Sequence, residues 1–492
     1  MIPVIDLFAG PGGLNEGFSS ILAKNGSPAF STLASFEMDE AACQTLRLRA
    51  TYRHLKNTGG DRRPYYRYIQ GLQSWTETLK GPFKDAYELA SKHVVRAELG
   101  LGERPRVDAH IQKLLGPEHQ RDQWVLIGGP PCQAYSLAGR SRRTGDEAFE
   151  SDLKHFLYRE YLHIVSTFKP SIFVMENVKG LLSATNGGQG MLKKILTDLE
   201  DLPSGVQYEI RSLTVETQPG EKPQPGDFVI RSEEYGIPQK RHRVILLGIR
   251  SDLVEIAPRQ VLVPSDRRLT VRDAIADLPR VQSNISTRKP KNEAVDWPAE
   301  LAVAKRIGAE AFSVHKATNT DDKSGRDLRN WLFRDAPRHV TQHEPRAHMI
   351  SDLVRYYLMS AKALELGRSP KYSDLEEKFL PDHLNIEREN TPFVDRFKVQ
   401  VWDEPSTTVV SHISKDGHYY IHPNPKQGRS LTVREAARLQ TFPDNYFFEG
   451  PRTQQFHQVG NAVPPLLAHK IGQQVLAILE AIAKEPHSPV QQ

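Results

Sequence analysis

Short apolar runs alternate with amphipathic stretches over the first half of the chain, and each run ends in polar or glycine residues. The runs lie at 4–8, 31–36, 124–127, 172–175 and 243–249, and helix-like spacing follows them, as from Leu14 to Leu22. Runs of this length are typical of buried strands, and their alternation with helices predicts a doubly wound, mainly parallel α/β sheet. Such sheets bind ligands beyond the carboxyl ends of their strands, so we look for a site there.

The periodicity weakens in the second half of the chain and returns near its end. Residues 251–428 are rich in proline, charge and histidine. Thr432 and Glu435 then form a capping-box pattern for a helix that we expect to end at Pro443. We expect a core domain at 1–250, a smaller inserted domain at 251–428, the second part of the core at 429–484 and a disordered tail at 485–492.

The amino-acid composition bears on the compartment of the protein and on its partners. Two cysteines in 492 residues cannot form a disulfide framework, which favours a reducing compartment such as the cytoplasm. The start MIPVIDLFAG lacks a basic segment and is not typical of a signal peptide. No apolar run reaches the roughly 18 residues of a membrane span, so we expect no membrane partner. The net charge of +5 permits an anionic partner without requiring one.

The first apolar run ends in the glycine turn FAGPGG. The turn lacks the spacing of a dinucleotide motif, because Asn15 stands where the third glycine would be. Its glycines let the backbone approach a ligand closely. Glu37, at the end of the second run, is placed to accept hydrogen bonds from a ribose diol, although an isolated glutamate there is more often solvated. Together the two features predict a nucleoside cofactor.

The third run ends in GGPPCQ, which contains Cys132. A free cysteine is most often a small buried hydrophobic residue. Here two prolines rigidify the turn, two glycines open space, and the turn follows a strand. With no second cysteine nearby to share a metal, the pattern favours a nucleophile whose thiolate needs cationic neighbours or helix dipoles.

The last two runs are flanked by ionisable residues. Glu176 either accepts backbone N–H groups or has a pKa raised by a partly apolar pocket, in which case it can donate a proton. Arg241 and Arg243 share a face of an extended segment. They form either a solvated edge or a clamp for an anion or a carbonyl.

Six segments, in this order, resemble the motifs of the DNA (cytosine-5)-methyltransferase family: DLFAGPGG, GGPPCQAYS, MENVKG, QKRHR, RSLTVREAARLQTFPDNY and QVGNAVPPLLA. They span Asp6 to Ala468. The resemblance implies a class I, Rossmann-like methyltransferase fold, S-adenosylmethionine as methyl donor and no metal. It also implies double-stranded DNA as substrate and a monomeric enzyme of the bacterial restriction-modification type.

The resemblance also assigns chemistry. The Cys132 thiolate adds to C6 of cytosine while Glu176 hydrogen-bonds and protonates the ring at N3. Arg243 holds the O2 atom of the base, with Arg241 beside it. Because the target base is stacked inside a duplex, the enzyme must flip it out.

Matching positions give the expected contacts. Cofactor contacts are expected from Phe8, Gly10, Gly12, Gly13, Glu37, Asp108, Pro131 and Asn461. DNA contacts are expected from Gln133, and from Ser136, Arg140, Arg142 and Arg143 in the loop at 134–150. This loop either closes over the flipped base, as we expect, or is a solvated basic loop. The chain departs from the family at Met38, where many relatives carry an aromatic residue against adenine. Asp108 is a weak match to the acidic motif that recognises adenine.

Two regions are expected to bear on DNA recognition. Residues 52–106 are longer than in relatives, and their RRPYYRY forms either a nucleic-acid surface or a solvated loop. Residues 251–428 are expected to be the target-recognition domain. Within it we expect a packing helix at 350–366 and a hairpin at 409–423 with its turn at Asp416-Gly417, which would place Lys415 or His418 in a groove. The side chains suited to bases and phosphates are Arg326, Arg329, Arg334, Arg338, His339, Gln342 and His343.

The same sequence features bear on other possible functions. The tRNA-modifying branch of the family carries a CFT tripeptide, which is absent because Cys43 and Cys132 are the only cysteines. Intact Cys132, Glu176 and Arg243 argue against an inactive DNA-binding adaptor. Amino-methyltransferases have an aromatic residue, not a cysteine, after the two prolines. Protection from a partner restriction endonuclease, phage defence with other proteins, and host genome modification stay open.

Overall fold

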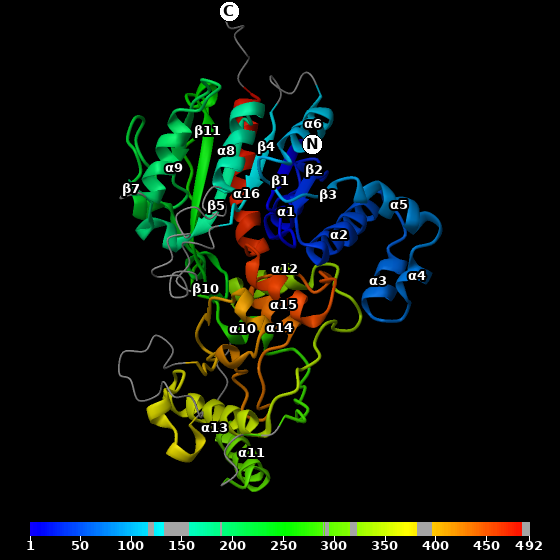
Figure 1. Ribbon diagram of the computed structural model, residues 1–492, viewed down its shortest axis with the longest axis vertical. Coiled ribbons are helices and arrows are strands. Elements are labelled where there is room, and N and C mark those ends of the chain that lie inside the picture. The colour runs from blue at the N-terminus through cyan, green and yellow to red at the C-terminus, as the bar shows by residue number, and fades with distance from the viewer. Residues whose placement is uncertain are drawn as a thin grey trace, which may run out of the picture. The chain divides into compact units, whose positions relative to one another are not determined.

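The chain divides into two compact units in a computed structural model (Figure 1). The sheet unit comprises 1–235, 242–264 and the residues from 462 onward, and the helical unit comprises 236–241 and 265–461. Structure is described for residues 1–116, 123–131, 157–186, 189–288, 290, 295–314, 322–380 and 396–484.

An eight-stranded sheet forms the centre of the sheet unit, among the residues described above. Its strands are β1 (Ile2–Leu7), β2 (Phe30–Glu37), β3 (Val94–Arg96), β4 (Val125–Gly128), β5 (Ile172–Val178), β8 (Tyr208–Arg211), β9 (Val229–Arg231) and β11 (His242–Arg250). The order is β3-β2-β1-β4-β5-β11-β8, with β9 paired to β11. The strands from β3 to β5 are mutually parallel and β11 is antiparallel to β5. This order confirms the doubly wound, mainly parallel sheet.

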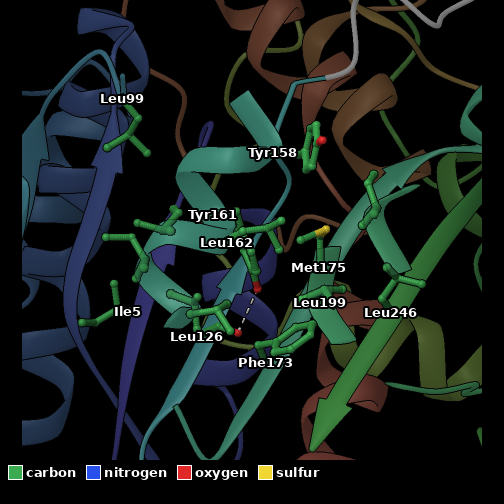
Figure 2. Close-up of a cluster of buried hydrophobic side chains, with 14 of the residues drawn as sticks. Ile5, Leu99, Leu126, Tyr158, Tyr161, Leu162, Phe173, Met175, Leu199 and Leu246 are labelled. Atoms are coloured by element: carbon green, nitrogen blue, oxygen red, sulfur yellow. Dashed lines mark hydrogen bonds between the residues drawn. The ribbon is translucent and has the colours of Figure 1, made fainter. Parts of the chain in front are cut away.

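The sheet is buried on both faces, which explains why its strands are nearly continuous apolar runs. Ile5, Leu126 and Phe173 belong to the hydrophobic cluster shown in Figure 2. Residues one position along, which point to the other face, are equally buried. Within the cluster the Tyr161 hydroxyl lies 3.0 Å from the carbonyl oxygen of Val174 and 3.4 Å from that of Leu126. One side chain thus ties together the two strands that lead to the candidate site.

Helices flank these strands and connect them. They are α1 (Gly13–Ser19), α2 (Glu40–Thr58), α3 (Arg63–Ile69), α4 (Trp75–Thr78), α5 (Gly81–Ser91), α6 (Arg104–Leu115), α8 (Leu157–Phe168), α9 (Met191–Glu200) and α16 (Pro465–Ile482), with a small pair of strands, β6 (Thr185–Asn186) and β7 (Gln189–Gly190), before α9. α1 packs so closely on α16 that a Cβ atom at Gly17 would lie 2.4 Å from Ala468 Cβ. α1 ends at Ser19, before the expected Leu22, because Leu22 pairs with Pro28.

The insertion at 52–106 folds into helices, so RRPYYRY is not a solvated loop. Its tyrosines belong to α3, and Tyr65 is buried with its ring 4.8 Å from that of Tyr52. The basic residues Arg63 and Arg67 of the same helix are exposed. Tyr65 therefore belongs to the interior of the insertion, and Tyr66 and Tyr68 of the same helix are half-buried.

The helical unit is built on helices, and the strands described in it are two residues long. Its elements are α10 (Val271–Ile275), α11 (Trp297–Val314), α12 (Lys323–Phe333), α13 (Ile350–Leu366), α14 (Val433–Leu439), α15 (Arg452–Asn461), β10 (Gln239–Lys240) and β12 (Ser406–Thr407). α13 has the bounds expected from the sequence and packs against α11 around Leu353, Tyr357 and Trp297. Its predicted role in packing is confirmed.

The expected hairpin at 409–423 is wrong. The segment contains two short 3-10 helices, Ser411–Ser414 and His418–Tyr420, joined at Gly417 with φ 76°. The turn was predicted correctly, but Ile421 pairs with Val399 and Ser430 instead of with the first half of the segment. His418 is not free to enter a DNA groove, because its ring stacks on Phe397 with centroids 4.3 Å apart.

Gln342 and His343 are also not available to read bases. Gln342 is buried, with its amide nitrogen 2.8 Å from the carbonyl oxygen of Phe448 and its amide oxygen 3.1 Å from the Phe448 nitrogen. His343 is buried, with Nε2 2.7 Å from the carbonyl oxygen of Pro279. The prediction of base contacts from these two residues is wrong, since both hold the helical unit together.

The capping box that opens α14 is confirmed. The Glu435 nitrogen donates to Thr432 Oγ1 at 3.2 Å, and the Thr432 nitrogen donates to Glu435 Oε2 at 2.7 Å. The helix ends at Leu439, earlier than the expected Pro443, because Thr441 takes a left-handed conformation with φ 61°. α14 and α15 belong to the helical unit, so the units divide at positions other than 250 and 428.

Candidate active site

The turn after β4 needs its glycines because two other groups occupy the space of their side chains. A Cβ atom on Gly128 would lie 2.5 Å from the carbonyl oxygen of Leu7 on the neighbouring strand. A Cβ atom on Gly129 would lie 2.8 Å from Glu176 Oε2. The first glycine therefore permits β1 and β4 to pair closely, and the second permits the Glu176 carboxylate to lie against the turn.

Glu176 forms an ion pair with Arg243. β5 runs to Val178, so Glu176 lies within the strand, and Arg243 is its diagonal neighbour on the antiparallel β11. Arg243 Nε lies 2.8 Å from Glu176 Oε1, and the side chains are only 13% and 14% exposed. Burial lowers the pKa of the Arg243 guanidinium from its ordinary value, and the charge of Glu176 offsets part of that effect. The pair fixes a carboxylate and a guanidinium beside the turn.

Asn177 connects the same strand to the turn. Its buried side-chain amide donates to the carbonyl oxygen of Pro130 at 3.4 Å. Glu176 and Asn177 therefore contact successive residues of the GGPP turn from opposite faces of β5. This contact positions Pro131, the last described residue before Cys132.

The glycine loop after β1 is bonded to the end of β2. The Gly10 nitrogen donates to Glu37 Oε2 at 2.7 Å, while Glu37 Oε1 accepts from the nitrogens of Met38 and Asp39 at 2.9 and 2.8 Å. Burial raises the pKa of Glu37, and these N–H donors offset part of the rise. Phe8 has φ 54°, a conformation that non-glycine residues adopt at a cost, typically at functional sites. The expected cofactor residues Phe8, Gly10 and Glu37 thus lie together.

Asp6 lies directly before this loop and is the least satisfied carboxylate of the sheet unit. It is 1% exposed, and neither carboxylate oxygen has a hydrogen-bond partner among the described residues. Burial raises the pKa of Asp6 well above its ordinary value. A buried acceptor without a donor is costly unless a ligand completes it, so Asp6 indicates a binding site at the end of β1.

Three other predicted residues have contacts of their own. Asp108 lies on α6 and accepts from His163 Nε2 at 2.8 Å. Arg241 is buried in the helical unit, where its guanidinium donates to the carbonyl oxygens of Val409 and Gly460 at 2.9 and 3.3 Å. Asn461 is exposed at the end of α15, 3.3 Å from His457 Nδ1. The contacts of Arg241 are those of a structural residue.

Several expected site residues lie outside the described part of the chain. They are the nucleophile Cys132, the DNA-contact residues Gln133, Ser136, Arg140, Arg142 and Arg143, and the loop at 134–150. Where the structure is described, no group of three or more His, Cys, Asp and Glu residues is arranged to hold a metal ion. Over the same ranges, none of the helices has the length and apolar character that crossing a membrane requires.

The structure adds residues that the sequence did not reveal. Asp6 was hidden inside an apolar run, although a carboxylate at an otherwise apolar strand position was a usable signal. Asn177 was seen only as a neighbour of Glu176. Glu98 is an exposed carboxylate two residues after β3, a strand of only three residues that no apolar run announces.

The fold and the site first define a class. A parallel, doubly wound sheet with a glycine loop after β1 and a carboxylate at the end of β2 is the class I S-adenosylmethionine-dependent methyltransferase fold. A crystal structure of a prophage-encoded E. coli protein, named as a DNA modification methyltransferase, matches the chain with a TM-score of 0.56 at 19% identity, covering 98% of this chain and 100% of that one. That likeness establishes the fold alone.

The chain belongs to the C-5 cytosine-specific DNA methylase family, which it matches over residues 108–477. It is 35% identical to Type II methyltransferase M.Bpa9945I of Bacillus paralicheniformis, over 97% of this chain and 99% of that relative. It is 27% identical to Type II methyltransferase M.AgeI of Thalassovita gelatinovora, over 96% of this chain and 98% of that relative. The predicted family and the predicted DNA (cytosine-5)-methyltransferase activity are therefore confirmed, and DNA is the substrate of the family.

Proposed function

We propose that the protein is a sequence-specific duplex DNA methyltransferase that transfers a methyl group from S-adenosylmethionine to C5 of a flipped cytosine, with Cys132 as covalent nucleophile. The observation that carries the proposal is the Glu176–Arg243 pair, held against the glycine turn that leads to Cys132. An acid and a hydrogen-bond donor beside a nucleophile are the groups that an unreactive cytosine ring requires.

Each of these side chains has a defined role in the proposed reaction. The Cys132 thiolate forms a bond to C6, and the electron pair of the C5–C6 double bond moves into the ring, which Glu176 protonates at N3. Arg243 donates to O2 and holds Glu176 in place through their ion pair. Once C5 carries the methyl group, a base removes the C5 proton, the C5–C6 double bond re-forms, and the C6–Cys132 bond breaks to regenerate the thiolate. N3 returns its proton to Glu176. Arg241 keeps a structural role in this account.

The described residues fit S-adenosylmethionine, which when bound supplies an electrophilic methyl group. Gly10 and Gly12 take φ 54° and 87° and leave the loop open to a ligand. Asp6 has two acceptor oxygens to complete, which suits a cationic amine. Glu37 accepts hydrogen bonds at the end of β2 and suits a ribose diol. Since Asp108 is paired with His163, we propose that Glu98, after β3, is the better-placed carboxylate for an adenine amine.

Sequence choice is proposed to lie in the region between the arginine motif and α14. Two basic residues of α12, the exposed Arg326 and the half-buried Arg329, are candidates for phosphate or base contacts. The names of the two relatives support a restriction-modification role with a partner endonuclease. Modification of tRNA is the alternative reaction, and phage defence and host genome modification are the alternative biological roles.

The proposal is tested by expressing the chain in a host that lacks cytosine methylation and mapping 5-methylcytosine across its genome. We expect methylation at one short sequence with the wild type and none with Cys132→Ala. Methylated tRNA together with unmethylated genomic DNA would show that the protein belongs to the tRNA-modifying branch of the family. Absence of both products from a well-folded protein would contradict the proposed enzyme.

A further inference from the structure

The insertion at 52–106 carries the charge excess of the whole chain. It contains eleven lysines and arginines against six aspartates and glutamates, an excess of five that equals the net charge of +5 of all 492 residues. The rest of the sequence is therefore electrically balanced. The insertion also precedes residues 108–477, over which the family match extends. The shared machinery of the family does not account for this concentration of charge.

Three lysines stand along α5: Lys84 within the helix, Lys80 directly before it and Lys92 directly after it. Lys80, Lys84 and Lys92 stand at intervals of four and eight residues, with Glu88 completing the row, and all four are exposed. Positions four apart lie on one face of a helix, which places Lys84, Glu88 and the C-cap residue Lys92 on the same side, and the extended N-cap residue Lys80 precedes them. Phe83, on the other side, is buried. At 1.5 Å per residue the row is about 18 Å long.

Most of this row has no acidic partner. Lys84 lies 3.6 Å from Glu88 in an exposed pair, and such pairs are weak in water. Lys80 and Lys92 form no ion pair with any residue that the structure describes. On α3, the exposed Arg67 donates to the neutral Gln73 at 2.9 Å. These cations are free to meet an anionic surface.

A rigid interior holds the row in place. Trp75 of α4 packs its ring 5.1 Å from that of Tyr68 on α3 and 5.0 Å from that of Tyr87 on α5. α2, which leads into the insertion, is tied to α1 because Arg49 Nε donates to Glu16 Oε2 at 2.8 Å in a buried pair. Figure 1 shows α3, α4 and α5 beside the β3 edge of the sheet. The lysine row is thus presented by a folded, anchored element.

We propose that the lysine row of α5 binds the phosphate backbone of the duplex DNA substrate and adds affinity without choosing the sequence. This inference rests on the proposed function, since it takes duplex DNA as the substrate. Lysines that neutralise phosphates release condensed counterions, which strengthens binding in a salt-dependent way. Phosphate contacts carry no sequence information directly. The row has the regular spacing and cationic character of such a contact and lacks the aromatic or amide side chains that read bases.

The test compares two triple variants that lose the same charge. Lys80→Gln, Lys84→Gln and Lys92→Gln remove the row, and Lys24→Gln, Lys193→Gln and Lys222→Gln remove three exposed lysines elsewhere on the sheet unit. Binding of both variants and the wild type to a 30-base-pair duplex is measured by fluorescence anisotropy between about 50 and 200 mM NaCl. We expect the slope of log K against log salt to fall by about 0.9 for each lysine in contact, hence by about 2 to 3 for the row variant, and to change little for the control.

A slope of the row variant equal to that of the control would overturn the proposal. At low salt the row variant should methylate the same sequence as the wild type, and a changed sequence would also overturn it, because the row would then take part in readout. Equal melting temperatures of the variants and the wild type verify folding. A wild type that binds DNA but never methylates it would contradict the proposed function, while the slope comparison would still decide the role of the row.

Discussion

Charged side chains are buried in both units of the molecule, but their partners differ. At the carboxyl edge of the sheet, Asp6 has no partner among the described residues, and the Glu176–Arg243 pair keeps 14% and 13% of its side chains exposed. In the helical unit, Arg429 and Glu435 are 0% and 1% exposed and meet through two hydrogen bonds of 2.7 Å. Glu435 also accepts from the Thr432 nitrogen.

This difference distinguishes charges that serve a functional site from charges that stabilise the fold. A buried charge whose hydrogen bonds are all made within the protein has nothing left to offer a ligand, and its removal costs stability. A charge that is partly exposed or incompletely bonded costs stability itself and is retained where chemistry needs it. The carboxyl edge of the sheet is therefore expected to respond to mutation in rate or ligand binding, and the helical unit in stability.

The largest effect is expected at Glu176. Glu176→Gln keeps the shape of the side chain but removes the acid, so methyl transfer should fall by about 10²- to 10⁴-fold. Cofactor affinity should change little, because Glu176 lies on a different strand from the Gly10–Glu37 contact. Single-turnover methylation and calorimetric titration measure the two quantities. Glu234→Gln, which removes an exposed ion pair with Arg231, is the control. If the rate of Glu176→Gln were within a few-fold of the rate of this control, Glu176 would have a structural role and no catalytic one.

Glu435→Gln is the reciprocal change in the helical unit. It leaves the Arg429 charge buried without its partner, so the free energy of unfolding should fall by about 3 kcal/mol or more. Glu376→Gln, which breaks an exposed pair with Lys378, should cost less than about 1 kcal/mol. Denaturant titration measures both. The Arg429 partner holds the pKa of Glu435 well below its ordinary value. The wild type should therefore have the larger free energy of unfolding at neutral pH and lose this advantage over Glu435→Gln in strong acid. Equal free energies of unfolding at pH 7 would contradict a structural role of the pair.

Gly129→Ala tests the fit between the turn and Glu176. The added Cβ would lie 2.8 Å from Glu176 Oε2 and must displace the carboxylate. A displacement of this kind should lower the methylation rate by about 10- to 100-fold, with folding preserved. Gly102→Ala, whose Cβ would meet nothing within 4 Å, is the matched control. Equal rates for the two variants would show that the close approach is incidental.

The smallest effect is expected at Asp6. Because the folded-state pKa of Asp6 is raised, wild-type stability falls as pH rises through the ordinary carboxyl range, near pH 4. Asp6→Asn should therefore be more stable than the wild type by about 1 kcal/mol at pH 7, and the gain should vanish below about pH 4. The same variant should gain less thermal stability when S-adenosylmethionine is added. If S-adenosylmethionine stabilised Asp6→Asn as much as the wild type, Asp6 would not be part of the cofactor site.

Sequence patterns were sufficient for the parts of the molecule that depend on local order. The strands, and the placement of Glu176 at the carboxyl edge, follow from apolar runs and from the common direction of parallel strands. Arg243 reaches the same edge because β11 is antiparallel to β5 and begins there. The sequence did not predict that Asp6 lacks hydrogen-bond donors and has a raised pKa, because both depend on which groups surround a buried strand position.

Long-range partners explain the errors. Gln342 and His343 have the side chains of base-reading residues, but Phe448 and Pro279, far away in sequence, take up their hydrogen bonds. The expected hairpin has a correct turn at Gly417, yet Ile421 pairs with Val399 and Ser430. No local pattern contains these contacts.

The measurement that tests the central claim most directly is trapping on DNA that carries 5-fluorocytosine at the methylated position. Fluorine cannot leave as a proton does, so the bond between the nucleophile and C6 should persist, and mass spectrometry of the digested complex locates it. We predict one adduct, on Cys132, formed by the wild type and by Cys43→Ala but not by Cys132→Ala; Cys43 is buried, and burial raises the pKa of its thiol to about 12. An adduct on any other residue, or methylation by Cys132→Ala, would contradict the account.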